Sequence, residues 1–328
     1  MVAGGFGGKS AGRQSEEAAR LAKITGKPVQ VAFTRAEEFF YDTFDPASVV
    51  KIVSAVDTNG KITLWEYDVY FAGDRAAELF YDVPNVRMRV SGGWMGGGGN
   101  THRFAVGPWR APGANMNVFA RESQLDVMAA AAGIDPLEFR LRNTSDERVR
   151  ACLKQAAAAF GWKPAVGPSG RGFGVAIGLD SGSYAALMAE VKVDRERGTV
   201  KVERVVCAQD MGTVVNPVGA TMQVEGCITM GLGYVLTEEL RFKGGRQLDD
   251  NFGTYDIPRF SWLPKIETVL VKNDALPPQG GGEPAIVPMG AVIANAVFDA
   301  TGARLFRLPI TPSRLKAALA EVKPPAKA

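Results

Sequence analysis

Apolar and polar residues follow two different rhythms along this chain of 328 residues. A period near 3.6 residues is typical of helices that bury one face, and a period of two is typical of half-buried strands. The helical pattern predicts helices over residues 15–25, 115–132, 136–142, 146–160, 217–235, 291–302 and 312–320. The alternating pattern predicts strands over residues 29–35, 49–71 as a hairpin, 174–179, 185–194, 199–210 and 266–274.

Turn and cap residues sharpen these boundaries. Ser15 is the expected N-cap of the first helix and Gly26 its stop, while Asp57-Thr58-Asn59-Gly60 is the expected turn of the hairpin. Residues 72–108 are rich in glycine and are expected to be irregular. Helices and strands mix without a strict βαβ order, which favours an α+β fold with mixed sheets and packed helices. The Pro- and Gly-rich GWKPAVGPSGRG suggests two lobes, residues 1–162 and 163–328.

Composition narrows the function classes. The formal net charge is only +3, and no run of Lys and Arg is interleaved with aromatic residues, so we expect no nucleic-acid partner. No uncharged stretch reaches the roughly 20 residues of a membrane helix, and no signal peptide is evident, so a cytoplasmic location is expected. Three widely spaced cysteines cannot ligate a cluster, and one histidine, His102, cannot build a multi-histidine metal site. We therefore expect no protein-ligated metal.

Glycine is abundant, with 38 residues clustered as GGFGG, GGWMGGGG and QGGGE. Such loops let a backbone approach a ligand closely. The first loop does not match a nucleotide motif, because a P-loop needs glycine where Ala3 stands and a dinucleotide loop needs glycine where Ser10 stands. The last cluster precedes a single carboxylate, Glu283, and no other charge lies between Ala275 and Phe298. Without further information this residue would be interpreted as the entry to a helix.

Four segments, in this order, resemble one family. They are GGFGGK at residues 4–9, PWRAPGANMNVFARESQLDVMAAAAGIDPLEFRLRN at 108–143, QVEGCITMGLGYVLTEEL at 223–240, and GGGEPAIVPMGAVIANAVFDATGARLFRLPIT at 280–311. Together they resemble the molybdopterin-binding subunit of the molybdenum hydroxylases, the xanthine dehydrogenase and aldehyde oxidase family. The short connection after RLRN resembles the isoquinoline 1-oxidoreductase and nicotinate dehydrogenase branch.

The resemblance implies an oxidoreductase that hydroxylates a carbon of its substrate with oxygen derived from water. Its cofactor would be a molybdopterin, as the cytosine dinucleotide, that carries molybdenum. Glu283, in the GEP motif, would be the catalytic base, and a base that works near neutrality benefits from apolar surroundings. The resemblance also implies cofactor-binding residues, namely Gly5, Phe6, Gly7, Gly8, Arg110, Ala111, Gln223 and Gly282. Ser10, Pro112 and Tyr255 are the expected substrate-pocket residues.

Relatives that oxidise purines have an acidic residue where this chain has Ser10, which favours an N-heterocyclic aromatic compound other than a purine, or an aldehyde. The expected partners are a chain that supplies the N-terminal half of the molybdopterin-binding subunit, a subunit with two iron–sulfur clusters, and possible flavin (FAD) or cytochrome subunits. Two questions stay open. The sequence is either a natural split subunit or a fragment. The chain is either catalytic or a non-catalytic scaffold of such a complex.

Overall fold

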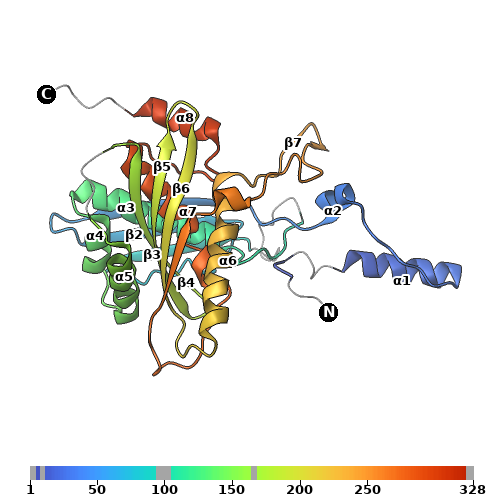
Figure 1. Ribbon diagram of the computed structural model, residues 1–328, viewed down its shortest axis with the longest axis horizontal. Coiled ribbons are helices and arrows are strands. Elements are labelled where there is room, and N and C mark those ends of the chain that lie inside the picture. The colour runs from blue at the N-terminus through green and yellow to red at the C-terminus, as the bar shows by residue number, and fades with distance from the viewer. Residues whose placement is uncertain (1–4, 8–11, 94–104, 164–167, 323–328) are drawn as a thin grey trace.

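The computed structural model describes residues 5–7, 12–93, 105–163 and 168–322, and Figure 1 shows a body of two sheets and several helices with an arm that extends from it. The helices are α1 Arg13–Thr25, α2 Arg35–Tyr41, α3 Ala114–Ala132, α4 Pro136–Arg142, α5 Glu147–Phe160, α6 Pro217–Leu236, α7 Met289–Thr301 and α8 Pro312–Glu321, with 3-10 turns η2 Phe260–Trp262 and η3 Pro284–Ile286. The strands are β1 Val49–Val56, β2 Ile62–Tyr70, β3 Val86–Ser91, β4 Arg171–Asp180, β5 Ser183–Asp194, β6 Thr199–Asp210, β7 Phe242–Lys243, β8 Arg246–Gln247 and β9 Lys265–Leu270.

The larger sheet has the order β4-β5-β6-β9, with antiparallel neighbours except for the parallel pair β6-β9. Helix α7 packs on β4 and β5, and α5 packs on β5 and β6. Two glycines of β4 allow the close approach of α7. A Cβ on Gly172 would lie 2.2 Å from the carbonyl oxygen of Ala296, and one on Gly174 would lie 2.0 Å from that of Val292. Any side chain at these positions would push the helix away from the sheet.

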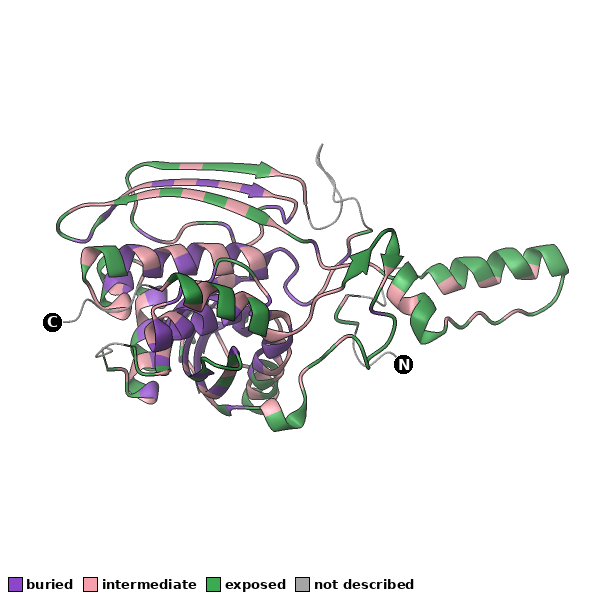
Figure 2. Cartoon of the chain, turned by 90° about the horizontal axis from the view of Figure 1, so that it is seen from above, coloured by how far each residue is buried: buried purple, intermediate pink, exposed green. Residues whose placement is uncertain are grey.

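The smaller sheet, β1-β2-β3, packs on α3 through β1, and Figure 2 shows it as a layer beside the helices. Alternate residues of β2, Trp65, Tyr67 and Val69, are buried on the face that packs on the helices. The Tyr67 hydroxyl donates to Oδ1 of Asn117 in α3 at 2.8 Å, so the buried ring keeps a polar partner. The hairpin β1-β2 confirms the prediction from the alternation and from the turn that ends at Gly60.

Three local predictions were wrong. Residues 86–91 form β3, whereas the whole segment 72–108 was expected to be irregular; β3 runs parallel to β2, which only tertiary contacts specify. Residues 29–35 were predicted to form a strand, but the structure assigns no strand there. Helix α1 begins at Arg13 with Gly12 at the N-cap position, not at Ser15, and it has no side-chain cap. The stop at Gly26, in the left-handed conformation, is confirmed.

Two hydrophobic clusters form the core, and each contains residues from both sides of the boundary expected near residue 162. Val118 of α3 belongs to the first cluster together with residues of β4 to β6, α6 and α7, and Leu125 of α3 belongs to the second with residues of β2, α5 and β4. Residues Pro284–Thr301 are apolar enough to cross a membrane, but 89% of that window is buried inside the protein. In the part of the chain that the structure describes, this is the interior helix of a globular core.

A cluster of charged side chains lies inside this core, on the inner side of α3. The carboxylate of Glu122, with no exposed surface, accepts hydrogen bonds from Arg140 Nε at 2.9 Å, from the Tyr81 hydroxyl at 3.0 Å and from the backbone N–H of Ile177 at 3.2 Å. Arg121 Nε adds a contact at 3.3 Å. Buried charges persist only when they are paired and hydrogen-bonded, as these are. The cluster joins α3, α4 and β4.

Candidate active site

Glu283 precedes η3, and its carboxylate points away from that turn. Oε1 accepts a hydrogen bond from the backbone N–H of Ala111 at 2.8 Å, and Oε2 accepts one from Arg75 Nη2 at 2.6 Å. The side chain makes no capping hydrogen bond to the turn that follows it. The interpretation as a helix-entry residue therefore accounts for the position of the Glu283 backbone but not for the contacts of its carboxylate. About a third of the side chain, 36%, remains exposed. The carboxylate is therefore fixed in direction yet still accessible.

Arg75 changes the expected surroundings of Glu283. The sequence around Glu283 is uncharged, but the fold brings this guanidinium from a loop 208 residues away, so the surroundings are not apolar. Asp180, at the end of β4, holds the other side of the guanidinium, with Arg75 Nε to Oδ1 at 2.8 Å and Nη2 to Oδ2 at 2.9 Å. Burial opposes the charge of Arg75, but the hydrogen bonds and charges of Asp180 and Glu283 raise its pKa overall. A planar guanidinium bound on two sides gives Glu283 a rigid neighbour.

The loop that carries Arg75 is itself fixed to α3. The side-chain amide of Asn117 donates to the carbonyl oxygens of Gly73 and Arg75, each at 2.9 Å. Arg121 Nη1 donates to the carbonyl oxygens of Ala76 and Glu78, each at 2.8 Å. The position of Arg75, and through it that of Glu283, thus depends on buried residues of α3.

Arg110 connects three of the segments noted in the sequence. Its Nε donates to the carbonyl oxygen of Gly282 at 2.8 Å, and Nη2 donates to Oε1 of Gln223 at 2.8 Å. The side chain is buried, and its guanidinium carbon lies 5.5 Å from the centre of the Phe6 ring. The Cys227 thiol donates to the same carbonyl of Gly282 at 3.3 Å. Arg110 therefore braces the backbone that presents Glu283.

The glycine loop near the N-terminus lies against the segment that holds Arg110. Gly7 has φ of +122°, and a Cβ there would lie 1.3 Å from the carbonyl oxygen of Pro108. No other residue type fits this contact. Phe6, also with a positive φ, exposes 56% of its surface beside Arg110. Ala111 has a positive φ of 58°, which turns its N–H toward Glu283. Positive φ at residues other than glycine is uncommon and often occurs at functional sites.

Phe6, Gln223 and Gly282 leave room for a cofactor next to Glu283. A Cβ on Gly282 would meet only Oε1 of Gln223, at 3.7 Å, so the backbone there is open on the side of the exposed Gln223 side chain. The Phe6 ring is exposed on the same cluster. Among the described residues, no group of three or more His, Cys, Asp or Glu side chains could hold a metal ion.

The remaining predicted site residues make no hydrogen bond or ion pair with Glu283 or lie outside the described residues. Tyr255 donates to Oε2 of Glu238 at 3.2 Å, and its ring packs on Phe39. Pro112 is buried next to Ala111. Gly5 is exposed at the start of the loop. Gly8, Ser10 and His102 lie outside the described residues. The roles of all these residues stay predictions.

Arg75 and Asp180 are the two site residues that the sequence did not suggest. Arg75 stands in GDRAAE, in the segment expected to be irregular, and Asp180 ends a strand where a turn residue is ordinary. No local pattern announces a pair that is 105 positions apart. The sequence shows only that Arg75 follows a glycine and an aspartate in a loop between predicted elements.

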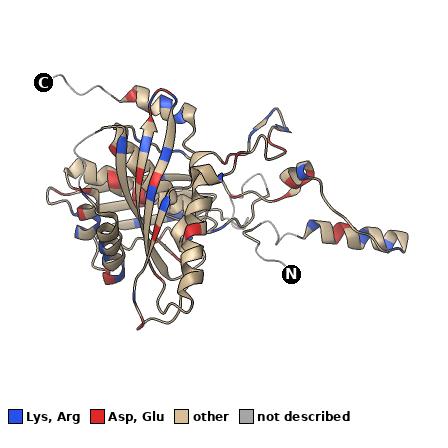
Figure 3. Ribbon diagram, viewed as in Figure 1, with Lys and Arg blue, Asp and Glu red and all other residues tan. Residues whose placement is uncertain are grey.

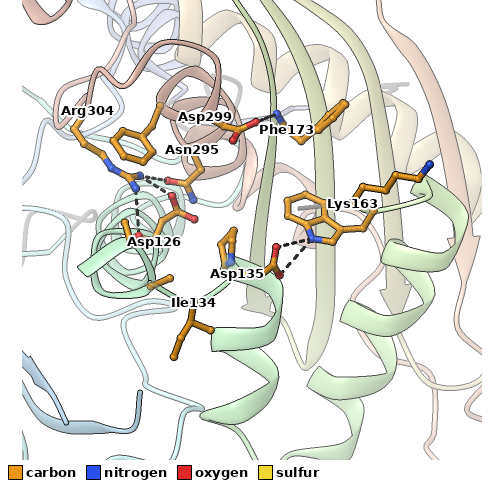
Figure 4. A pocket seen from close by; sticks show the side chains of 13 residues that line it. Asp126, Ile134, Asp135, Lys163, Phe173, Asn295, Asp299 and Arg304 are labelled. Carbon is orange, nitrogen blue, oxygen red and sulfur yellow. Dashed lines mark hydrogen bonds and ion pairs between the residues drawn. The ribbon is translucent and has the colours of Figure 1, made fainter. Parts of the chain in front are cut away.

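A separate cavity of about 90 Å³ lies between α3, α4, α7 and the Trp162 side chain (Figure 4). Three polar pairs line it: Arg304 Nη1 with Asp126 Oδ2 at 2.6 Å, Trp162 Nε1 with Asp135 Oδ2 at 3.1 Å, and the N–H of Phe173 with Asp299 at 2.8 Å. Burial raises the pKa of Asp299 and lowers that of Arg304.

Comparison with known proteins shows the family to which this chain belongs. Two models of a molybdopterin cofactor-binding domain match residues 1–144 and 140–264. A nicotinate dehydrogenase subunit from Pseudomonas putida is 31% identical over 97% of this chain and 30% of its own length. The beta subunit of isoquinoline 1-oxidoreductase from Brevundimonas diminuta is 31% identical over 98% of this chain and 43% of its own length. The chain thus spans less than half the length of these relatives.

Among solved structures, quinoline 2-oxidoreductase from Pseudomonas putida 86 superposes with a TM-score of 0.82 at 16% identity, over 98% of this chain and 68% of that one. Such a likeness shows the fold alone. The fold and the matched domains define a molybdopterin-binding protein. The chain belongs to the molybdenum hydroxylase family, in the molybdopterin-binding large subunit.

Proposed function

We propose that this chain is a catalytic part of a molybdenum hydroxylase and that Glu283 is its general base. The observation that carries the proposal is the accessible Glu283 carboxylate, held by Ala111 and Arg75 beside the cluster of Arg110, Gln223 and Gly282. When bound, the molybdenum–pterin group would supply the two-electron oxidation and the activation of water. The chain would supply the base and its orientation.

Glu283 has the capacity for this role. A carboxylate has about four acceptor positions on its two oxygens, and the hydrogen bonds from Ala111 and Arg75 use two of them. The remaining positions can take a proton from an oxygen that lies within about 3 Å. Arg110, Gln223 and the exposed face of Phe6 would hold the cofactor. Gly5, Gly7 and Gly8 would let it approach the backbone, and Ser10, Pro112 and Tyr255 would contact the substrate.

The substrate class we propose is an N-heterocyclic aromatic compound, with an aldehyde as the alternative. The names of the two relatives, which refer to nicotinate and isoquinoline, support the first choice. We further propose that the pterin carries a cytosine dinucleotide, and that electrons leave through a partner subunit with two iron–sulfur clusters, followed by a flavin or cytochrome subunit. The complex would be cytoplasmic. The other candidate, a non-catalytic scaffold, would not need the two-sided support of Glu283.

The deciding experiment is Glu283→Gln in the assembled complex, assayed with nicotinate, isoquinoline and simple aldehydes and an artificial dye acceptor. General bases contribute about 10²–10⁴-fold, so turnover should fall by at least about 100-fold while the molybdenum and pterin contents stay unchanged. Glu196→Gln, in the exposed turn between β5 and β6, is the matched control and should retain full activity. Unaltered turnover in Glu283→Gln would favour the scaffold.

A further inference from the structure

The cavity between α3, α4 and α7 shares no lining residue with the cluster around Glu283. Its volume of about 90 Å³ is several times the roughly 10–15 Å³ that one buried water needs on the same measure. Figure 4 shows the side chains that line it, which come from separate stretches of the chain between Asp126 and Arg304. The space is therefore large enough for a small molecule and not only for one water.

An unpaired oxygen of Asp126 is the first sign that this cavity takes a ligand. The residue is 6% exposed, and its Oδ2 accepts a hydrogen bond from Arg304 Nη1 at 2.6 Å. Its Oδ1, however, has no hydrogen-bond partner among the described residues. Arg140 Nη1 lies 3.6 Å from Oδ1, which is too far for a hydrogen bond. A buried acceptor is costly without a donor, and the N–H group of a ligand would supply one.

Negative charge is in excess around the cavity. Asp135 and Asp299 line it together with Asp126, and Figure 4 shows the three carboxylates grouped around the same space. Asp299 Oδ2 accepts the N–H of Phe173 at 2.8 Å, which adds no positive charge. Burial raises the pKa of Asp299, and the charges of Asp126 and Asp135 add to this rise. Asp299 therefore lies in a negative field that a bound cation would relieve.

The two cationic side chains of the lining do not neutralise Asp299. Arg304 is directed to Asp126, since Nη1 donates to Oδ2 and Nη2 donates to the backbone carbonyl oxygen at 3.2 Å. Its guanidinium carbon also lies 3.4 Å from the centre of the Phe298 ring. Lys163 is exposed, and Figure 4 shows its ammonium group directed away from the carboxylates. A cation from solution can therefore supply the missing charge.

The remaining lining selects the kind of cation. Among the described residues, no group of three or more His, Cys, Asp or Glu side chains could hold a metal ion, so a metal is not favoured. Trp162, Phe173 and Phe298 contribute aromatic surface, which attracts organic cations. Oδ1 of Asp126 calls for an N–H donor. Together these features favour an organic cation with N–H groups and only a few non-hydrogen atoms.

We propose that this cavity binds a small organic cation with N–H groups, a primary ammonium or a guanidinium, and that Asp126 Oδ1 and Asp299 accept its hydrogen bonds. Such a ligand would join two helices of the core, because Asp126 belongs to α3 and Asp299 to α7. The inference does not depend on the proposed function, since the cavity contains neither Glu283 nor any residue assigned to the cofactor. A ligand that binds only the folded chain also raises its stability.

Isothermal titration calorimetry of the purified chain with methylammonium and guanidinium chlorides at millimolar concentration tests the proposal. We expect saturable binding at one site with a dissociation constant of about 1 mM or lower. At ten times that concentration the melting temperature should rise by at least about 1 °C. Sodium chloride at equal ionic strength is the baseline. If neither cation gives saturable binding below about 20 mM, the proposal is wrong.

Two further compounds separate charge from hydrogen bonding. Tetramethylammonium has the charge but no N–H group, and acetamide has N–H groups but no charge. Each should bind at least about tenfold more weakly than methylammonium, because a hydrogen bond to a charged group requires both. Equally tight binding of acetamide would show that the excess negative charge does not select the ligand, which would overturn the proposal.

A matched pair of substitutions on α3 locates the bound cation. Ala130 is exposed and lines the cavity, so Ala130→Leu should fill the space and abolish binding. Its neighbour Ala131 is also exposed but is not part of the lining, so Ala131→Leu should bind as the unaltered chain does. Alanine and leucine are both good helix formers, and circular dichroism should confirm that both variants are folded. Unchanged affinity in Ala130→Leu would place the cation elsewhere and refute the assignment.

A charge variant at Asp299 gives an independent check that does not alter the volume. Asp299→Asn keeps an acceptor for the N–H of Phe173 and removes the negative charge. Methylammonium should then bind at least about tenfold more weakly. Full affinity in this variant would contradict the role of Asp299, whatever Ala130→Leu shows. None of these results bears on the turnover of Glu283→Gln, so the inference and the proposed function can fail separately.

Discussion

Removing the charge of Glu122 is the sharpest test of the packing that supports the site. Glu122→Gln keeps the volume of the side chain but removes the negative charge that faces Arg140 at 2.9 Å and Arg121 at 3.3 Å. All three side chains are at most 1% exposed, so water cannot replace the lost partner. The new amide N–H₂ group would also point at one of these N–H donors.

The expected loss of unfolding free energy is about 3–5 kcal/mol, the usual cost of leaving a buried charge without its partner. Asp126 limits this loss, because its carboxylate lies 3.6 Å from Arg140. Chemical denaturation followed by tryptophan fluorescence measures the change. The matched control is Glu138→Gln on α4, whose side chain is 55% exposed and pairs with Arg142 at 3.4 Å. That surface pair should be worth no more than about 0.5 kcal/mol.

A loss below about 1 kcal/mol for Glu122→Gln would refute this reasoning, because it would mean that water or another group compensates the two arginines. The double variant Glu122→Met with Arg140→Met gives a second check. This variant removes the charge of Arg140 as well, but it leaves Arg121 Nε, the Tyr81 hydroxyl and the Ile177 N–H without the acceptor that Glu122 supplies. It should therefore also lose about 3–5 kcal/mol of unfolding free energy, and an unchanged value would show that apolar residues can replace the cluster.

Three further results are expected. Gly174→Ala should lower the unfolding free energy by about 1–3 kcal/mol, since its Cβ would lie 2.0 Å from the carbonyl oxygen of Val292; an unchanged denaturation midpoint would show that α7 can move away without cost. Burial raises the pKa of Glu238 to about 7. Burial and the nearby charge of Glu238 together raise the pKa of Asp45 to about 8. The pKa values of both carboxyl groups are higher in the folded chain than in the unfolded chain, so the protonated groups stabilise the fold. This stabilisation is complete below about pH 4 and is lost as the pH rises through 7 to 8. Thermal unfolding between pH 5 and 9 should show this fall, and Glu238→Gln should flatten it; an equally steep fall in the variant would contradict the assignment. Burial raises the pKa of Cys227 to about 11, so iodoacetamide at pH 8 should label it only after unfolding, and rapid labelling of the native chain would show that the site opens.

The regular elements follow from the sequence where local pattern and tertiary packing agree. Helices α3 and α4 appear with the break before Pro136, because Asp135 caps α4 in the way its sequence suggests. Strands β5 and β6 pair across their charged turn as the alternation predicts. Strand β3 was missed because Val86 to Ser91 join the sheet through a parallel pairing with β2, and no turn signal links the two strands.

The candidate site was predicted only in part, for a physical reason. Phe6, Arg110, Gln223 and Glu283 were predicted through the resemblance of their segments, and the structure brings these segments together. Arg75 was not found, because nothing in GDRAAE distinguishes an arginine that binds two carboxylates from one in solvent. Its partners are set by the fold. Both signs of charge are also spread over the helices and strands in Figure 3, so charge pattern alone could not single it out.

The partners of Glu283 show why the site depends on the whole fold. The N–H of Ala111 is 172 positions away in sequence and the guanidinium of Arg75 is 208 positions away. Ala111 precedes α3, Arg75 is held by residues of α3, and Glu283 precedes α7, which packs on α3 and β4. A carboxylate so placed cannot be oriented by either half of the chain alone. The position of the Glu283 carboxylate therefore depends on the packing of α3 against α7. A change that loosens this packing should disturb the site before it unfolds the chain.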